Sequence, residues 1–112
     1  MLQREVVWVK VQYSNLAEEK ERPALIISND SYNSKNLDLI VCAITSNLEE
    51  REHSVVISNS DFEKGGLPIK SKIRADKIVQ VEKKMVSGKI GELNTKTFDL
   101  VVKEIIKLIK KV

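Results

Sequence analysis

The segment KSKIRADKIVQV, residues 70–81, decides the fold class, because apolar and charged residues alternate along it. Alternation with a period of two predicts a β-strand with one face turned towards a core. The apolar positions of one parity are Ile73, Ala75, Val79 and Val81. Residues two apart in a strand lie on the same face, so Arg74 and Asp76 are predicted on one face, about 6–7 Å apart at the backbone.

Shorter β-like runs lie on both sides of this segment. The predicted strands cover residues 7–13, 24–27, 37–44, 53–58 and 88–93. Small and charged residues predict loops at 14–21 and 49–52, and the polar run 29–36 favours turns or one short helical turn. Pro23 opens the second strand and holds Arg22 in an extended conformation.

The C-terminal segment predicts a helix that begins at Asn94 or Thr95, since either side chain can cap it. Its apolar stripe at helical spacing consists of Phe98, Val101, Val102, Ile105, Ile109 and Val112. Ile106 and Leu108 lie off that stripe, which indicates either a dimer or an unusually broad core face. A capping-box pattern at 60–63 also predicts about one helical turn before Gly65.

Five or six strands followed by one helix predict a mainly β protein. We expect a small, strongly bent antiparallel sheet that curls into a partly open barrel, with the helix covering one side. A chain of 112 residues with 42% hydrophobic and 31% charged content is typical of one soluble domain, here residues 1–112.

The formal charge of +3 permits a nucleic-acid or acidic-protein partner without requiring one. The single cysteine, Cys42, lies in an apolar run, where we expect a buried and inert thiol. No apolar signal stretch and no membrane-spanning run is seen, so we expect a cytoplasmic protein with no membrane partner.

Arg22, Thr45, Ser46, Arg74 and Asp76 together provide groups suited to cleaving RNA through its own 2′-hydroxyl. A guanidinium stays protonated and donates two parallel hydrogen bonds to phosphate oxygens. A carboxylate can accept the 2′-hydroxyl proton, and the hydroxyls can donate to phosphate oxygens. Each group also has a structural alternative, namely an ion pair for the charged residues and a turn hydrogen bond for the hydroxyls.

Further candidates for binding RNA are Ser46, His53, Lys72 and Lys77. His53 is the sole histidine, and it would be a natural proton shuttle at neutral pH if it reached the site. The sequence has no Walker-type phosphate loop, no His/Cys cluster for zinc and no nucleophile elbow. We therefore expect a nuclease here to be metal-independent and to need no cofactor.

The chain resembles the MazF/PemK/Kid family of toxin endoribonucleases over roughly residues 5–108. The matching residues are Glu5-Val6-Val7-Trp8-Val9, Arg22-Pro23-Ala24-Leu25-Ile26-Ile27-Ser28-Asn29-Asp30, Ala43-Ile44-Thr45-Ser46, His53, Gly66-Leu67, Ser71-Lys72-Ile73-Arg74-Ala75-Asp76-Lys77-Ile78 and Ile90-Gly91-Glu92-Leu93. One difference is that Arg4-Glu5 stands where the family usually has Gly-Asp before the first strand.

The resemblance implies a homodimeric SH3-like barrel that cuts single-stranded RNA at short sequence motifs. It assigns the key pair to Arg22 and Thr45 by analogy with MazF-type members, and to Arg74 and Asp76 by analogy with Kid-type members. Asp76, or alternatively His53, would be the base, and the products would be a 2′,3′-cyclic phosphate and a 5′-hydroxyl. The resemblance also implies a cognate antitoxin with an acidic, partly disordered segment.

Two other functions remain open at this stage. A diverged toxin-like barrel can act by binding alone, as related barrels do when they inhibit DNA gyrase. A basic barrel can also bind RNA without cutting it, which would show as steeply salt-dependent binding with no cleavage.

Overall fold

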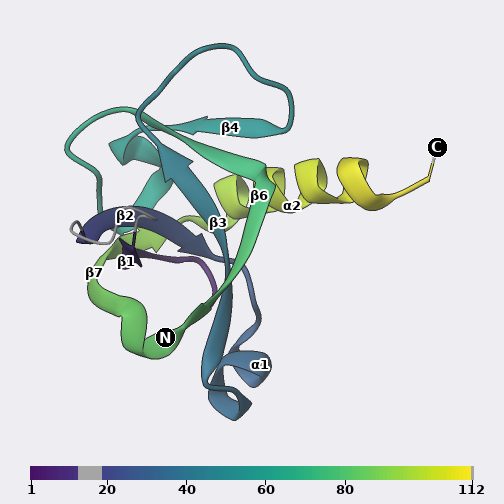
Figure 1. Ribbon diagram of the computed structural model, residues 1–112. Coiled ribbons are helices and arrows are strands. Elements are labelled where there is room, and N and C mark those ends of the chain that lie inside the picture. Colours follow the sequence, from purple (N-terminus) through teal and green to yellow (C-terminus); the bar gives the residue numbers. More distant parts are fainter. Residues whose placement is uncertain (13–18, 112) are drawn as a thin grey trace.

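Seven antiparallel strands form one sheet in the described part of the chain, and Figure 1 shows how the sheet curls round. The computed structural model describes residues 1–12 and 19–111. The strands are β1 (Glu5–Gln12), β2 (Glu19–Ile26), β3 (Asp38–Thr45), β4 (Ser54–Ile57), β5 (Phe62–Gly65), β6 (Ser71–Glu82) and β7 (Val86–Leu93). Their order in the sheet is β4-β6-β3-β2-β1-β7-β5. The predicted mainly β class is confirmed.

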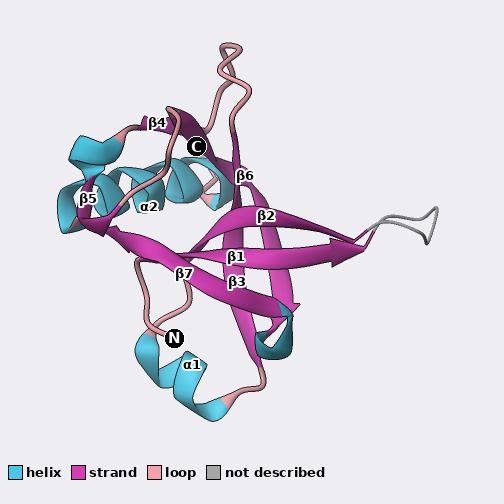
Figure 2. Cartoon of the chain, turned by 90° about the vertical axis from the view of Figure 1, so that its left-hand side faces the viewer, coloured by secondary structure: helices cyan, strands magenta, loops and turns pink. Residues whose placement is uncertain are grey.

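Two α-helices accompany the sheet in the described residues. The short helix α1 (Asp30–Lys35) connects β2 to β3, as the polar run there predicted. The longer helix α2 (Thr95–Ile109) follows β7 and packs against β4 and β6. In Figure 2, α2 lies at one end of the curled sheet and α1 at the other. The expected C-terminal helix on one side of the sheet is thus confirmed.

Buried side chains form two clusters on opposite faces of the central strands. One cluster lies under α2 and contains Val6, Leu25, Cys42, Ile44, Ile57, Leu67, Ile73, Leu93, Phe98 and Val101. The other lies within the curl and contains Val7, Val9, Ala24, Ile26, Leu39 and Val41. Because β1, β2 and β3 supply residues to both clusters, these strands are fixed on both faces. Burial also raises the pKa of the Cys42 thiol to about 12, in line with the predicted buried and inert cysteine.

A bulge of several residues in β6 changes the face of the sheet on which its side chains lie. Cys42 of β3 pairs with Ile78, but Ile44 pairs with Ile73, so two steps along β3 match five along β6. An odd number of steps reverses the parity of the strand. Val81 accordingly packs on the cluster within the curl, whereas Ile73 belongs to the cluster under α2. The prediction that the apolar residues of this strand share one face was therefore wrong beyond the bulge.

The sequence left Asn94 and Thr95 as candidates for the N-cap of α2. The Asn94 side chain accepts a hydrogen bond from the backbone N–H of Thr97 at 2.8 Å, so Asn94 is the N-cap. The capping box predicted at 60–63 was wrong, because it starts two residues earlier. Ser58 and Asp61 form it instead, and the turn is a 3₁₀ turn, Asn59–Asp61. The following residues form β5, which the sequence did not predict as a strand.

The predicted loop at 14–21 was wrong at its C-terminal end. Residues 19–21 belong to β2, where each pairs with a residue of β1. Lys10 and Glu19 form an ion pair at 3.6 Å across these strands, which helps to explain how such polar residues extend the ladder. The rest of that loop, and Tyr13 of the predicted first strand, lie outside the described residues.

The predicted apolar stripe of α2 packs on the sheet over only part of its length. Phe98 and Val101 are buried, and Val102 and Ile105 pack against the same cluster. Ile109 is 76% exposed, contrary to the prediction, because the end of α2 projects beyond the sheet (Figure 1). Val112 lies outside the described residues. Within the described residues, neither helix is a long apolar span of the kind that crosses a membrane.

Candidate functional site

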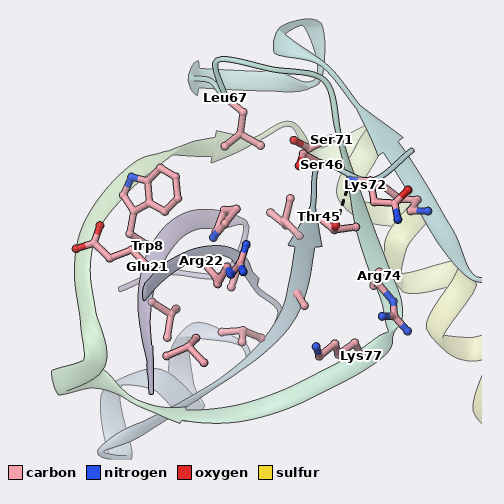
Figure 3. Close-up of a pocket in the computed structure, with 18 of the residues that line it drawn as sticks. Trp8, Glu21, Arg22, Thr45, Ser46, Leu67, Ser71, Lys72, Arg74 and Lys77 are labelled. Carbon is pink, nitrogen blue, oxygen red and sulfur yellow. Dashed lines mark hydrogen bonds between the residues drawn. The ribbon is translucent and has the colours of Figure 1, made fainter. Parts of the chain in front are cut away.

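A cavity of about 790 Å³ opens between two walls of the curled sheet (Figure 3). One wall comes from β1 and β2, and the other from β3 and β6. The residues labelled in Figure 3 are Trp8, Glu21, Arg22, Thr45, Ser46, Leu67, Ser71, Lys72, Arg74 and Lys77. Among the described residues that line the cavity, five are cationic and three are carboxylates, so its charge favours an anionic ligand.

The cavity opens where β2 and β3 stop pairing. Their ladder ends with Ala24 opposite Ala43. Two steps further along the same register, Arg22 and Thr45 would face each other, but the strands diverge before they reach this pair. Pro23 fits this divergence because proline has no N–H to donate towards β3. The divergence leaves Arg22 and Thr45 on facing walls of the cavity.

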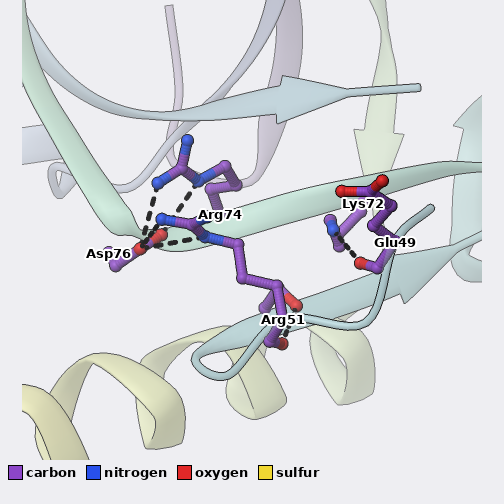
Figure 4. Close-up of polar contacts among 6 residues, drawn as sticks. Glu49, Arg51, Lys72, Arg74 and Asp76 are labelled. Atoms are coloured by element: carbon purple, nitrogen blue, oxygen red, sulfur yellow. Dashed lines mark hydrogen bonds and ion pairs between the residues drawn. The ribbon is translucent and has the colours of Figure 1, made fainter. Parts of the chain in front are cut away.

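Three charged side chains form a compact cluster at the bulge of β6 (Figure 4). The Asp76 carboxylate accepts hydrogen bonds from Nε and Nη2 of Arg74 at 3.1 and 3.0 Å. It also accepts hydrogen bonds from Nε and Nη2 of Arg51 at 3.3 and 3.0 Å. The predicted placement of Arg74 and Asp76 on one face is confirmed by this contact, and so is the ion pair that was its structural alternative.

The two guanidinium groups change the acidity of the carboxylate. Hydrogen bonds from Arg74, and then from Arg51, lower the pKa of Asp76 to about 2. The same hydrogen bond to Asp76 raises the pKa of Arg74. Asp76 is thus a carboxylate at neutral pH, and it is a weak base for as long as both arginines hold it.

Lys72 and Thr45 are held by the loop that follows β3. Lys72 is only 4% exposed, and its Nζ donates to the backbone carbonyl of Glu49 at 2.5 Å. Thr45 Oγ1 accepts a hydrogen bond from the N–H of Asn47 at 3.2 Å, which is the turn contact that the structural alternative foresaw. Thr45 still has its hydroxyl hydrogen available for a ligand in the cavity.

His53 lies apart from the cavity lining. Its backbone has a φ of 56°, a left-handed conformation that few non-glycine residues adopt. Its Nδ1 lies 3.7 Å from Oε1 of Glu104 in α2. Its carbonyl accepts a hydrogen bond from the N–H of Ala75, between Arg74 and Asp76. His53 therefore joins the loop, β6 and α2, and its ring faces the helix.

The structure brings most of the predicted site residues together. Those that line the cavity are Arg22, Thr45, Ser46, Lys72, Arg74 and Lys77. Asp76 is attached to this group through Arg51 and Arg74, whereas His53 is not brought to it.

Several residues of the cavity were not predicted from the sequence, among them Trp8, Glu21 and Arg51. Trp8 had a usable signal, because its position opposite Pro23 follows once β1 and β2 are paired as a hairpin. Arg51 had no such signal, since it lies in a charged loop whose path is set by contacts with β6.

Comparison with known proteins gives one family. The family described as PemK-like, MazF-like toxin of type II toxin-antitoxin system matches residues 2–109, nearly the whole chain. None of the curated proteins matches this chain.

Solved structures show the same fold at low sequence identity. An endoribonuclease from a Mycobacterial species, in complex with its cognate antitoxin, is 20% identical over 96% of this chain and 92% of that chain, with a TM-score of 0.79. A MazF in a MazE-MazF structure from Deinococcus radiodurans is 18% identical over 100% of this chain and 98% of that chain, with a TM-score of 0.82. The expected MazF-like barrel with a C-terminal helix is confirmed by these similarities.

Proposed function

Since this chain belongs to the PemK-like, MazF-like toxin family of type II toxin-antitoxin systems, we propose that it is a metal-independent, sequence-specific endoribonuclease that cleaves single-stranded RNA. The main support is the cavity in which Arg22, Thr45 and Arg74 face a common space of about 790 Å³. Cavities of this size hold small organic ligands, and this one has room for a nucleotide. The cations match phosphate, and RNA itself supplies the nucleophile.

The proposed reaction is an intramolecular transfer at phosphorus. Asp76 accepts the proton of a ribose 2′-hydroxyl, and the 2′-oxygen attacks the adjacent phosphorus in line with the 5′-oxygen. The bond from phosphorus to the 5′-oxygen breaks, and that oxygen leaves with a proton from water. The products are a 2′,3′-cyclic phosphate and a 5′-hydroxyl. No step of this proposed reaction requires a metal ion or a cofactor.

The predicted site residues that line the cavity have supporting roles in this reaction. Arg22 and Arg74 stabilise the charge that develops on the phosphate oxygens, because their guanidinium groups stay protonated. Thr45 and Ser46 orient the phosphate by donating hydrogen bonds to its nonbridging oxygens. Lys72 and Lys77 add positive charge along the same wall.

Asp76 is the base that the geometry favours over His53. Asp76 contacts Arg74, which lines the cavity, whereas the Nδ1 of His53 faces Glu104. The lowered pKa of Asp76 makes it a weak base in the free protein. The proposal therefore requires that bound RNA draws at least one arginine away from the carboxylate, which strengthens it as a base.

The family also supports two protein partners. We propose a cognate antitoxin with an acidic segment, since one structural relative was solved in complex with its cognate antitoxin and another is a MazE-MazF structure. We propose a homodimer because α2 exposes Leu100, Ile106, Leu108 and Ile109, and Leu100 lines a shallow hollow together with exposed Val56 of β4. We also propose that the protein acts in the cytoplasm, where mRNA is translated.

The function is tested by incubating the purified protein with a long RNA in excess EDTA. We expect discrete fragments with 5′-hydroxyl ends. Arg22→Ala, Thr45→Ala and Arg74→Ala should each slow cleavage by about 10²–10³-fold. Lys84→Ala is the control, because Lys84 pairs with Glu82 away from the cavity. Intact RNA with the unaltered protein would overturn the proposal and favour a protein that acts by binding alone. Cleavage by Arg22→Ala and Arg74→Ala at the rate of the unaltered protein would overturn the proposed site.

A further inference from the structure

Arg51 reaches the candidate site from a loop that the sequence did not mark. Its guanidinium donates twice to Asp76 and at the same time lines the cavity (Figure 4). Its side chain is 48% exposed, so a ligand in the cavity can reach it.

The loop places Arg51 by backbone contacts that do not depend on its charge. The hydroxyl of Ser54 donates to the carbonyl of Arg51 at 2.6 Å. The N–H of Ala75 donates to the carbonyl of His53 at 3.0 Å, so the loop is fastened to β6 between Arg74 and Asp76. Arg51 is therefore set beside the bulge even when its side chain is released from the carboxylate.

One carboxylate in this cluster serves two guanidinium groups. Both Arg51 and Arg74 donate to the same oxygen, Oδ2 of Asp76, at 3.0 Å. A carboxylate and a phosphodiester present similar pairs of oxygens to a guanidinium fork. The cluster of two cations and one anion also keeps an excess positive charge, so it can accept a further anion.

We propose that Arg51 binds a phosphodiester of the RNA strand, and that Asp76 holds its guanidinium in position until that phosphodiester replaces the carboxylate. This inference rests on the proposed function and extends it, because it adds a phosphate contact on the loop side of the cavity. It also couples binding to catalysis. When RNA takes Arg51 away, Asp76 loses one of the two cations that make it a weak base.

A phosphodiester explains the arrangement better than an acidic peptide. Thr45 and Ser46 line the same cavity as Arg51, and hydroxyl donors suit phosphate oxygens. Glu49 and Glu50, close to Arg51 in the sequence, also line the cavity, and they would repel a run of peptide carboxylates at close range. RNA phosphates are spaced along an extended strand, so one of them can meet Arg51 while its neighbours avoid these glutamates.

The first test measures binding without cleavage. The probe is a fluorescein-labelled 2′-O-methyl RNA oligonucleotide, which has no free 2′-hydroxyl, titrated by anisotropy at several potassium chloride concentrations. Arg51→Ala should weaken binding by about tenfold and lower the slope of log affinity against log salt by about 0.7. Arg51→Lys should restore the slope but only part of the affinity, because lysine keeps the charge and loses the fork. Lys84→Ala should change neither quantity.

The second test uses a double-mutant cycle with Asp76→Asn. Removing the competing carboxylate should tighten binding of the same RNA several-fold. The gain from Asp76→Asn should be smaller in the Arg51→Ala background, because only Arg74 is then released, and an equal gain in both backgrounds would overturn the role of Arg51. Thermal unfolding of each variant confirms that it is folded before binding is compared.

The outcomes separate this inference from the proposed function. Unchanged affinity and salt slope in Arg51→Ala, with RNA still cleaved by the unaltered protein, would overturn the role of Arg51 alone. If Arg51→Ala weakened binding of an oligoglutamate peptide but left binding of RNA unchanged, the role of Arg51 would also be overturned. An unaltered protein that neither binds nor cleaves RNA would overturn both proposals.

Discussion

At the scale of single residues, the balance of charge around Asp76 decides what this site can do. Two guanidinium groups donate to its carboxylate and lower its pKa to about 2. The sequence left an ion pair as the structural alternative to a catalytic role for Arg74 and Asp76. This ion pair is present, and it is compatible with the catalytic role. In the proposed function it is a resting arrangement, in which the acid and both cations are already gathered beside the cavity.

This arrangement predicts how Asp76 titrates. Its folded pKa lies below the ordinary value of 3.8, so its pairing stabilises the fold above about pH 3.8, and this contribution is lost as the pH falls towards 2. The carboxyl carbon of Asp76, followed by NMR, should titrate near pH 2. In Arg51→Ala/Arg74→Ala its midpoint should rise towards 3.8. A midpoint that stays the same in both proteins would show that the two arginines do not hold the carboxylate in solution.

At the scale of secondary-structure elements, the edge strand β5 joins the sheet by a close approach to β7. Gly65 has a φ of +66°, and a Cβ there would lie 2.2 Å from the carbonyl oxygen of Ile90. Neither the left-handed conformation nor this contact suits a residue with a side chain. The pairing of Gly65 with Gly91 thus requires glycine on structural grounds.

Alanine substitutions test this requirement. Gly65→Ala should lower the free energy of unfolding by at least about 1 kcal/mol, because both the backbone conformation and the space disfavour a side chain. Gly88→Ala, in the same sheet, is the matched control. A Cβ at Gly88 would meet nothing closer than Cδ1 of Trp8 at 3.8 Å, so its effect should be about 0.5 kcal/mol or less. Equal stabilities in chemical denaturation would contradict the role of Gly65.

The strands and helices also show which elements could be predicted from the sequence. Alternation and helical spacing are local, and they correctly predicted β6, α2 and the end of β3 at Thr45. The bulge of β6 depends on which partner each residue finds, and no local pattern reports that the strand changes face before Val81. Likewise, the helical spacing of Ile109 gives no sign that the sheet ends before it.

The site was predictable where family resemblance and strand ends carried the information. Arg22 and Thr45 were found because each lies in a recognisable segment, and the divergence of β2 and β3 then leaves them on facing walls. Arg51 was missed because its position follows from the hydrogen bonds of its loop to β6. His53 was chosen for its chemistry, but its backbone conformation turns the ring towards Glu104.

At the scale of the whole molecule, the exposed apolar side chains of α2 bear on assembly. Ile106 and Leu108 were off the predicted stripe, and both lie exposed on the helix together with Leu100 and Ile109. Exposed apolar side chains of this number on one helix are costly to leave in water. The proposed homodimer would cover part of this apolar surface.

Sedimentation velocity tests this assembly. Ile106→Glu should shift the protein from dimer towards monomer, because a buried unpaired carboxylate disfavours the interface. Leu37→Glu is the control, since Leu37 is 86% exposed and lies at the start of β3, away from α2. Both variants should remain folded by circular dichroism. A monomeric unaltered protein, or identical sedimentation of the two variants, would argue against a dimer through α2.

The central claim is that RNA is cut by its own 2′-hydroxyl within the cavity between Arg22 and Arg74. The most direct measurement compares two RNA oligonucleotides that contain a mapped cleavage site and differ only in a single 2′-deoxy nucleotide immediately before the cut. We expect the all-ribose strand to be cut in excess EDTA, whereas the substituted strand stays intact at that position. Equal cleavage of both strands would contradict it, because the nucleophile would then come from elsewhere.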